Sequence, residues 1–200
     1  MDILMLNEEE PIKLVPAPVL AHLLNLSVDW DGRQVYLDGP IEEHTGAWFW
    51  TVLDALGTDE VTVHLNTPGG DEVSMFAIHD AIRRHGSVTV VAYGQVCSAG
   101  VLILACAQDR VVTQSTILMS HESTTTQGEL GYRAAKDRRK VDDWFHEYWC
   151  ELMGKYTPND AKWWKSTTEK KAEFWLLGGL AIVEAGIADR VCLLYTSRCV

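Results

Sequence analysis

The alternation of short apolar runs with amphipathic segments constrains the fold of this chain more than any other feature. The runs 34–37, 61–65 and 88–93 are rich in the β-branched and apolar residues that favour strands. The segments 43–56 and 72–84, which separate these runs, have helical spacing. Strands joined through helices pair in parallel by right-handed crossovers, and such sheets bind ligands beyond the carboxyl ends of their strands. We therefore expect an α/β fold with a mostly parallel sheet.

A long helix is expected over 132–155, where helix breakers are few. The helix carries a dense aromatic set: Trp144, Phe145, Tyr148 and Trp149. Interfaces between proteins are enriched in aromatic side chains, so this segment predicts self-association, with packing inside the chain as the alternative. Its basic residues within 133–140 are followed by Asp142 and Asp143, a mixture typical of a solvated helix face.

Composition limits the classes of function that remain. With 200 residues, of which 47% are hydrophobic, the chain can form one compact domain. A net charge of −11 argues against nucleic-acid binding, which needs a basic field. Without a long apolar run or a signal-like start, we expect a cytoplasmic protein that does not bind membranes. The five cysteines lack metal-ligand spacing and predict reduced thiols, so neither a metal nor a cofactor is expected.

One small hydroxyl residue marks the most reactive candidate position. Ser98 lies in the segment Gly94-Gln95-Val96-Cys97-Ser98-Ala99-Gly100, between the strand 88–93 and an expected helix over 99–107. A sharp strand-to-helix turn of this kind exposes the serine Oγ and leaves backbone N–H groups free to stabilise an oxyanion. A small residue between glycines could instead serve only close packing of the helix on the strand. The segment thus indicates a candidate nucleophile.

Two other segments supply the partners that such a nucleophile needs. His121 follows directly after the expected strand 116–120, where a general base would be held at the edge of a rigid sheet. The turn Asn66-Thr67-Pro68-Gly69-Gly70 follows the strand 61–65 and can bring bare backbone close to a substrate. The structural alternative is a plain loop in which Asn66 or Asp71 caps the next helix.

Taken together, these segments resemble the ClpP family, the proteolytic subunits of Clp protease, whose fold is shared with crotonase-like hydratases. The resemblance runs from about 33 to 191 and rests on these segments: 36–44, 65–70, 94–100, 117–121 and 184–189. It implies repeated β-β-α units with a protruding handle helix at about 124–155. The resemblance also implies that Ser98 is the nucleophile and His121 the base. It implies that the Gly70 and Ala99 amides form the oxyanion hole. The residues that it implies for substrate binding are Gly69, Asp71 and Glu122.

The family's third catalytic residue, an aspartate, has no counterpart in this chain. Counting forward from Tyr156-Thr157, which resembles the family's His-Thr pair, its position falls at Thr167. An aspartate in this role holds the histidine tautomer and stabilises the imidazolium. Three interpretations stay open: Thr167 supports the histidine through its hydroxyl, Glu169 serves as the acid, or the chain is a degenerate subunit.

The resemblance implies a serine endopeptidase of unfolded proteins, assembled as two heptameric rings and fed by an AAA+ unfoldase. A catalytically weak or inactive ring subunit that supports an active paralogue is the first alternative. A phage capsid-maturation protease of the same type and a crotonase-like acyl-thioester enzyme are the others. Ser98 and His121 argue against the last of these, because it would need no nucleophile.

The two ends of the chain stand outside the motif pattern. Residues 1–32 match no family motif, and by resemblance they form an axial or docking segment ahead of a peptidase domain over 33–191. The stretch Cys192-Leu193-Leu194-Tyr195-Thr196-Ser197 back-translates to TGT CTC TTA TAC ACA TCT, which is similar to a transposon adapter used in sequencing. Residues 192–200 are therefore expected to be a non-native tail.

Overall fold

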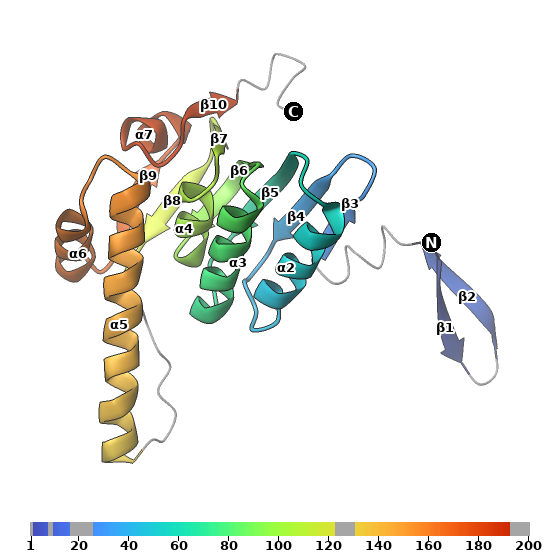
Figure 1. The fold of residues 1–200 in the computed structure, drawn as a ribbon, viewed down its shortest axis with the longest axis horizontal. Helices are drawn as coiled ribbons and strands as arrows, with labels where there is room; N and C mark the ends of the chain where they lie inside the picture. The colour runs from blue at the N-terminus through green and yellow to red at the C-terminus, as the bar shows by residue number, and fades with distance from the viewer. Residues whose placement is uncertain (1, 8–9, 17–25, 123–130, 193–200) are drawn as a thin grey trace.

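A mostly parallel sheet forms the centre of the computed structural model, which describes residues 2–7, 10–16, 26–122 and 131–192 (Figure 1). Its main path has the order β10-β7-β6-β5-β4-β3, and β8 and β9 branch from β6. The strands are β3 (Leu26–Asp29), β4 (Gln34–Asp38), β5 (Val61–Thr67), β6 (Val88–Cys97), β7 (Asp109–Thr113), β8 (Ile117–Ser120), β9 (Phe174–Leu177) and β10 (Arg190–Cys192). Only the β3–β4 and β8–β9 pairs within this sheet are antiparallel. The expected α/β fold is confirmed.

Helices pack beside one another over one face of this sheet. They are α2 (Thr45–Leu56), α3 (Glu72–His85) and α4 (Ala99–Ala105), with α2 against α3 and α3 against α4 (Figure 1). The strand β5 alternates fully buried and half-buried residues, as expected for a strand covered more completely on one face. Asp71 caps α3, because its Oδ1 accepts from the Ser74 amide at 2.7 Å. The sequence had left this capping role open beside a substrate-binding role.

The strand β6 is longer than the sequence indicated, and it changes partners along its length. Its first half pairs with β7, and residues 95–97 pair with β8 instead. Gly94 lies between the two halves with φ +62°, a conformation that a side chain would make costly. The prediction of a strand end at Tyr93 was therefore wrong, because the glycine redirects the strand without ending it. The redirected half carries Ser98 away from the main path of the sheet.

The long helix α5 (Tyr132–Tyr156) protrudes from the body of the molecule, as expected of a handle (Figure 1). Its last turns are buried against α6 (Ala161–Lys170), where Trp149 meets Trp164 edge-on at 5.5 Å. Phe145 and Tyr148 pack on Phe76 of α3, at ring-centroid distances of 5.5 and 5.3 Å. Packing inside the chain thus accounts for much of the aromatic set that sequence had assigned to an interface.

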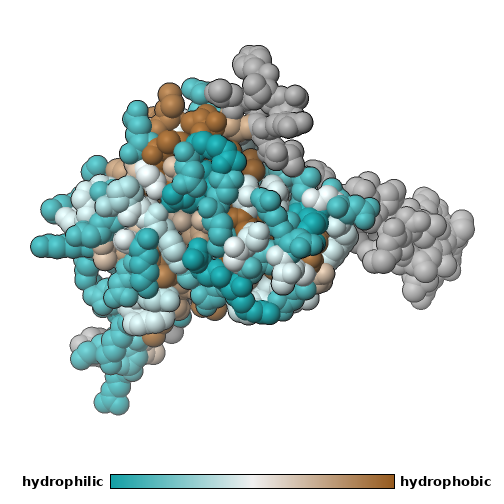
Figure 2. All heavy atoms as spheres, turned by 45° about the horizontal axis from the view of Figure 1, so that its top comes forward, coloured by the Kyte–Doolittle hydropathy of each residue, from teal (hydrophilic) through white to brown (hydrophobic). Residues whose placement is uncertain are grey.

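Some apolar side chains remain at the surface. Trp144 of α5 is 55% exposed. Figure 2 shows apolar residues gathered around α7 (Gly179–Glu184), where Leu177 and Leu180 are 71% and 59% exposed. None of the described helices is both long and apolar enough to cross a membrane.

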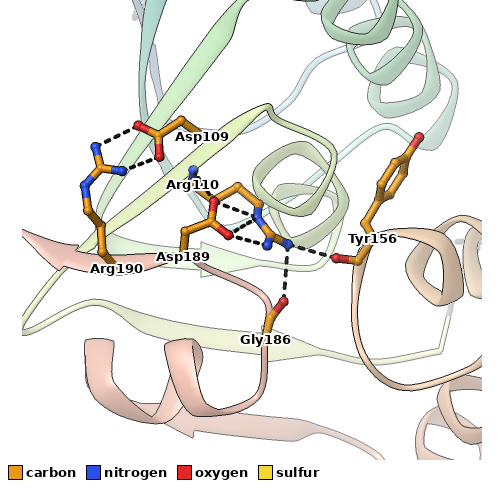
Figure 3. Close-up of polar contacts among 6 residues, drawn as sticks. All are labelled: Asp109, Arg110, Tyr156, Gly186, Asp189 and Arg190. Atoms are coloured by element: carbon orange, nitrogen blue, oxygen red, sulfur yellow. Dashed lines mark hydrogen bonds and ion pairs between the residues drawn. The ribbon is translucent and has the colours of Figure 1, made fainter.

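The C-terminal segment is held to β7 by a polar network centred on Arg110 (Figure 3). The Arg110 guanidinium donates to the Asp189 carboxylate and, through Nη1, to the carbonyls of Tyr156 and Gly186 at 2.8 and 3.2 Å. These hydrogen bonds lower the pKa of the Asp189 carboxyl. Arg190 pairs with Asp109 beside this network. The network joins three distant parts of the chain: β7, the end of α5 and the segment before β10.

The ends of the chain extend the fold beyond the expected domain limits. β1 (Asp2–Asn7) and β2 (Glu10–Pro16) form an antiparallel hairpin, and β3 joins the main sheet ahead of residue 33. Cys192 pairs with Thr113 within β10 and β7, so the sheet includes the first residue of the expected tail. Residues 193–200 and 123–130, including the start of the expected handle, lie outside the described residues.

Candidate active site

Ser98 occupies a strained turn between β6 and α4. Its backbone has φ +52° and ψ −115°, a region that L-residues rarely adopt. Its amide donates to the Met119 carbonyl at 2.7 Å, which ties the turn to β8. The Ser98 hydroxyl makes no capping bond to α4, so the Oγ is not engaged at the helix start. Strain of this kind is found preferentially at functional sites, where surrounding structure enforces it.

The turn at Gly69 and Gly70 lies directly against Ser98. A Cβ built on Gly69 would lie 2.6 Å from the Ser98 Cβ, so no side chain fits there. In the bridge to Ile41, the Gly69 carbonyl accepts and the Asp71 amide donates, which leaves the Gly70 amide facing away from Ile41. Outside the regular helices and strands, no backbone hydrogen bond between described residues uses the amide of Gly70 or Ala99. Two N–H groups near the serine are therefore free to receive an oxyanion.

A small pocket of about 30 Å³ brings the candidate residues together. Its lining residues come from β6, α3, α4, α5 and the end of β8: Glu72, Met75, Ser98, Ala99, Ser120, His121, His146 and Trp149. Ser98 and His121 thus share one pocket, although they come from different elements. Ser120 is buried, and its Oγ has no hydrogen-bond partner among the described residues. An unsatisfied buried hydroxyl in the pocket wall indicates room for a polar group of a bound molecule.

Neither sequence candidate for the third residue lines this pocket. Thr167 is half-buried in α6, and Glu169 is exposed. The neighbouring residue Thr168 is buried, and its Oγ1 lies 3.2 Å from the His146 Nε2. A second hollow, of about 280 Å³, adjoins His146 and is lined by Glu122, Asp142, Asp143, His146, Glu147, Lys165 and Glu169. Glu169 and Glu122 therefore lie in this acidic hollow, outside the pocket that contains Ser98.

No motif in the sequence singled out His146, which the structure places in the pocket. The sequence does hold a signal that His146 faces inward. His146 precedes Trp149, Cys150 and Met153 at helical spacing, and these three are buried. His64 and His79, by contrast, make structural contacts. His64 stacks on Tyr36, and His79 bonds the Tyr156 hydroxyl at 2.9 Å. Burial lowers the pKa of both.

The cysteines do not contribute to the pocket lining. Cys97 is buried next to Ser98, and burial raises the pKa of its thiol. Burial raises the pKa of Cys106 to about 12. Cys192 takes part in a disulfide, so the expectation of five reduced thiols was wrong at that residue. In the described part of the chain, no cluster of three or more histidine, cysteine or carboxylate side chains has metal-site geometry.

Comparisons with known proteins agree with this architecture. The family model for Clp protease matches residues 26–157. The chain is 28% identical over 149 residues to an ATP-dependent Clp protease proteolytic subunit 1 of Rhodococcus jostii, covering 70% of this chain and 64% of the relative. It is 25% identical over 169 residues to a proteolytic subunit 3 of Rhizobium etli, covering 78% and 87%.

The fold is also found among solved structures. A mutant ClpP1 from Listeria monocytogenes superimposes with a TM-score of 0.72 at 24% identity, covering 88% of this chain and 97% of that one. The described sheet and helices therefore have the architecture of that protein. Because the matching family model spans more than half of the sequence, the chain belongs to the Clp protease family.

Proposed function

We propose that this chain is a cytoplasmic serine endopeptidase, the proteolytic subunit of an ATP-dependent Clp-type protease. The observation that carries the proposal is the strained Ser98 turn, which shares a pocket with His121 and lies against the free Gly70 amide. Strained serine turns, a nearby imidazole and free amides are the parts that acyl transfer requires. Membership of the Clp protease family supports the same chemistry.

Each of these groups has its own role in the hydrolysis of a peptide bond. Ser98 Oγ attacks the substrate carbonyl carbon while the His121 imidazole takes the hydroxyl proton. The amides of Gly70 and Ala99 donate hydrogen bonds to the oxyanion that forms. His121 then gives its proton to the leaving amine, and water hydrolyses the acyl-enzyme with His121 again as the base.

The substrate would be unfolded polypeptide, bound as an added strand beside the segments after Gly70 and after His121. Main-chain hydrogen bonds of this kind recognise extended backbone with little regard to side chains. The subunits would assemble into two stacked heptameric rings that receive polypeptide from an AAA+ unfoldase. The protruding α5, with Trp144 exposed, supports assembly.

The test is intact-mass measurement of the full chain after reaction with a small fluorophosphonate. We expect one adduct per chain, lost in Ser98→Ala and strongly slowed in His121→Gln. Ser115→Ala removes an exposed serine elsewhere and should label like the parent. A folded parent that takes up no adduct, or a Ser98→Ala variant that still does, overturns the proposal.

A second candidate is a catalytically inactive ring subunit. It is favoured by one observation, the threonine at position 167 where the family has its aspartate. This candidate predicts assembly without any adduct, so sedimentation velocity beside the labelling measurement separates the two.

A further inference from the structure

Neither Thr167 nor Glu169 lines the pocket of Ser98 and His121, so another residue must orient the His121 ring. We propose that His146 is that residue, so that the chain replaces the usual acid by a second histidine, itself held by Thr168. The inference rests on the peptidase function proposed above. It assigns His146 as a positioning residue, because it acts on His121 and not on the substrate.

The position of His146 is the first support. It lines the same pocket as Ser98 and His121, and that pocket has a volume of about 30 Å³. One water occupies about 10–15 Å³ by this measure, so the pocket has room for about two waters. The hydrogen-bond partners of His146 among the described residues are Thr168 and Cys150, so its contact with His121 would run through a water in this pocket. Neither Thr167 nor Glu169 lines this pocket.

The hydrogen bonds of Thr168 favour one His146 tautomer. Thr168 Oγ1 lies 3.0 Å from the Trp164 carbonyl, which can only accept. A hydroxyl has one hydrogen, so when Thr168 donates it to this carbonyl, or to the Lys165 carbonyl at 3.2 Å, the contact at 3.2 Å to His146 Nε2 is donated by the histidine. The His146 Nδ1 then carries the lone pair and can accept from a water that in turn accepts from the N–H of His121. In this tautomer His146 offers the pocket a neutral acceptor, where an aspartate would offer a charged one.

Several charged groups lie around His146. From α5 these are Asp142, Asp143 and Glu147; from α6, Lys165 and Glu169; from the end of β8, Glu122; and from the start of α3, Glu72. Asp142 is paired with Arg138, and Glu147 with Lys165. Carboxylates therefore outnumber cations in the hollow behind His146. The Cys150 thiol, 3.8 Å from His146 Nε2, adds no charge, since burial raises its pKa to about 12.

The proton balance of the step is simple. His121 takes the Ser98 proton on one ring nitrogen and keeps its other N–H, which donates to a water that is bonded to His146 Nδ1. No proton passes to His146, and no bond to it forms or breaks. His146 contributes by fixing the tautomer and ring plane of His121 and by stabilising the imidazolium.

The experiment is the fluorophosphonate labelling rate as a function of pH, measured on the full chain. We expect His146→Ala to slow labelling by about 10- to 100-fold, as outer-shell partners of reactive groups do, and to move the midpoint of the pH–rate profile to lower pH. His146→Gln keeps an acceptor and should recover part of the rate. Thr168→Val should shift the profile in the same direction as His146→Ala, because it releases the His146 tautomer.

Two matched controls separate positioning from stability. His85→Gln makes the same exchange at the far end of α3, where His85 bonds the Gly57 carbonyl. Thr51→Val removes a helical threonine that bonds the carbonyl four residues earlier, as Thr168 does. Both should leave the pH midpoint in place.

The outcomes are distinguishable from failure of the proposed function. A parent that labels, with an unchanged rate and midpoint in His146→Ala, overturns the role of His146 alone. If His146→Ala does not fold, an unchanged midpoint in Thr168→Val overturns it instead. A parent that never labels overturns the peptidase proposal and this inference with it.

Discussion

Replacing Ser98 by glycine should make the protein more stable while it removes the candidate nucleophile. The residue is held at φ +52° and ψ −115°, and a conformation in such a sparsely populated region costs about 1–3 kcal/mol. Glycine adopts positive φ freely, so the variant escapes this strain. The added flexibility of the unfolded glycine chain offsets about 0.5–1 kcal/mol of the gain. We therefore expect a net stabilisation of about 1 kcal/mol.

The control is Ser98→Ala, which keeps the Cβ and hence the strain. Its stability should stay within about 0.5 kcal/mol of the parent, since no capping bond of the hydroxyl is lost. For a chain of this length, about 1 kcal/mol raises Tm by about 2–4 °C, which thermal unfolding followed by tryptophan fluorescence resolves. Protein concentration must be equal across variants, because assembly also raises Tm. If Ser98→Gly melts at or below Ser98→Ala, the backbone strain at the site is refuted.

Further predictions concern the glycine turn, the arginine network and a buried histidine. Gly69→Ala should lower the free energy of unfolding in urea by about 1–3 kcal/mol more than Gly57→Ala does. Both glycines have positive φ, but only a Cβ at Gly69 would lie against the candidate nucleophile. Equal losses in the two variants would contradict this close contact. Arg110→Met should cost about 2–4 kcal/mol by the same assay, because it leaves two carbonyls without their side-chain donor and the Asp189 carboxylate with only the backbone amide of residue 110. Arg190→Met, at an exposed pair, should cost under about 1 kcal/mol. Burial lowers the pKa of His79 in the folded state, so its contribution to stability is present above about pH 6.5 and is lost as the pH falls through the lowered value. His79→Gln should therefore flatten the decline of unfolding free energy between pH 7 and 5, and an unchanged slope would contradict it.

The sequence predicted the fold well where local pattern decides structure. Apolar runs separated by helical segments gave the parallel strands β4, β5 and β6, and the glycines at 69 and 70 indicated the close backbone turn that the structure contains. The strand-to-helix turn at Ser98 was also readable, since small residues follow a buried strand there. These features depend on neighbouring residues along the chain. Periodicity and backbone sterics act over a few residues, and so they are visible in the sequence.

Sequence alone could not identify what surrounds His121. Counting from the family pattern pointed to Thr167 and Glu169, but the rotation of α6 turns Thr168 inward toward His146 and leaves Glu169 in the acidic hollow. A one-residue step along a helix rotates a side chain by about 100°, so a small uncertainty in alignment changes which side chain faces the pocket. The sequence determined the strands and helices of the core and the serine turn through local geometry. Only the packing of α5 and α6 against the sheet decided which side chains meet at the pocket, because that choice depends on contacts between segments far apart in the chain.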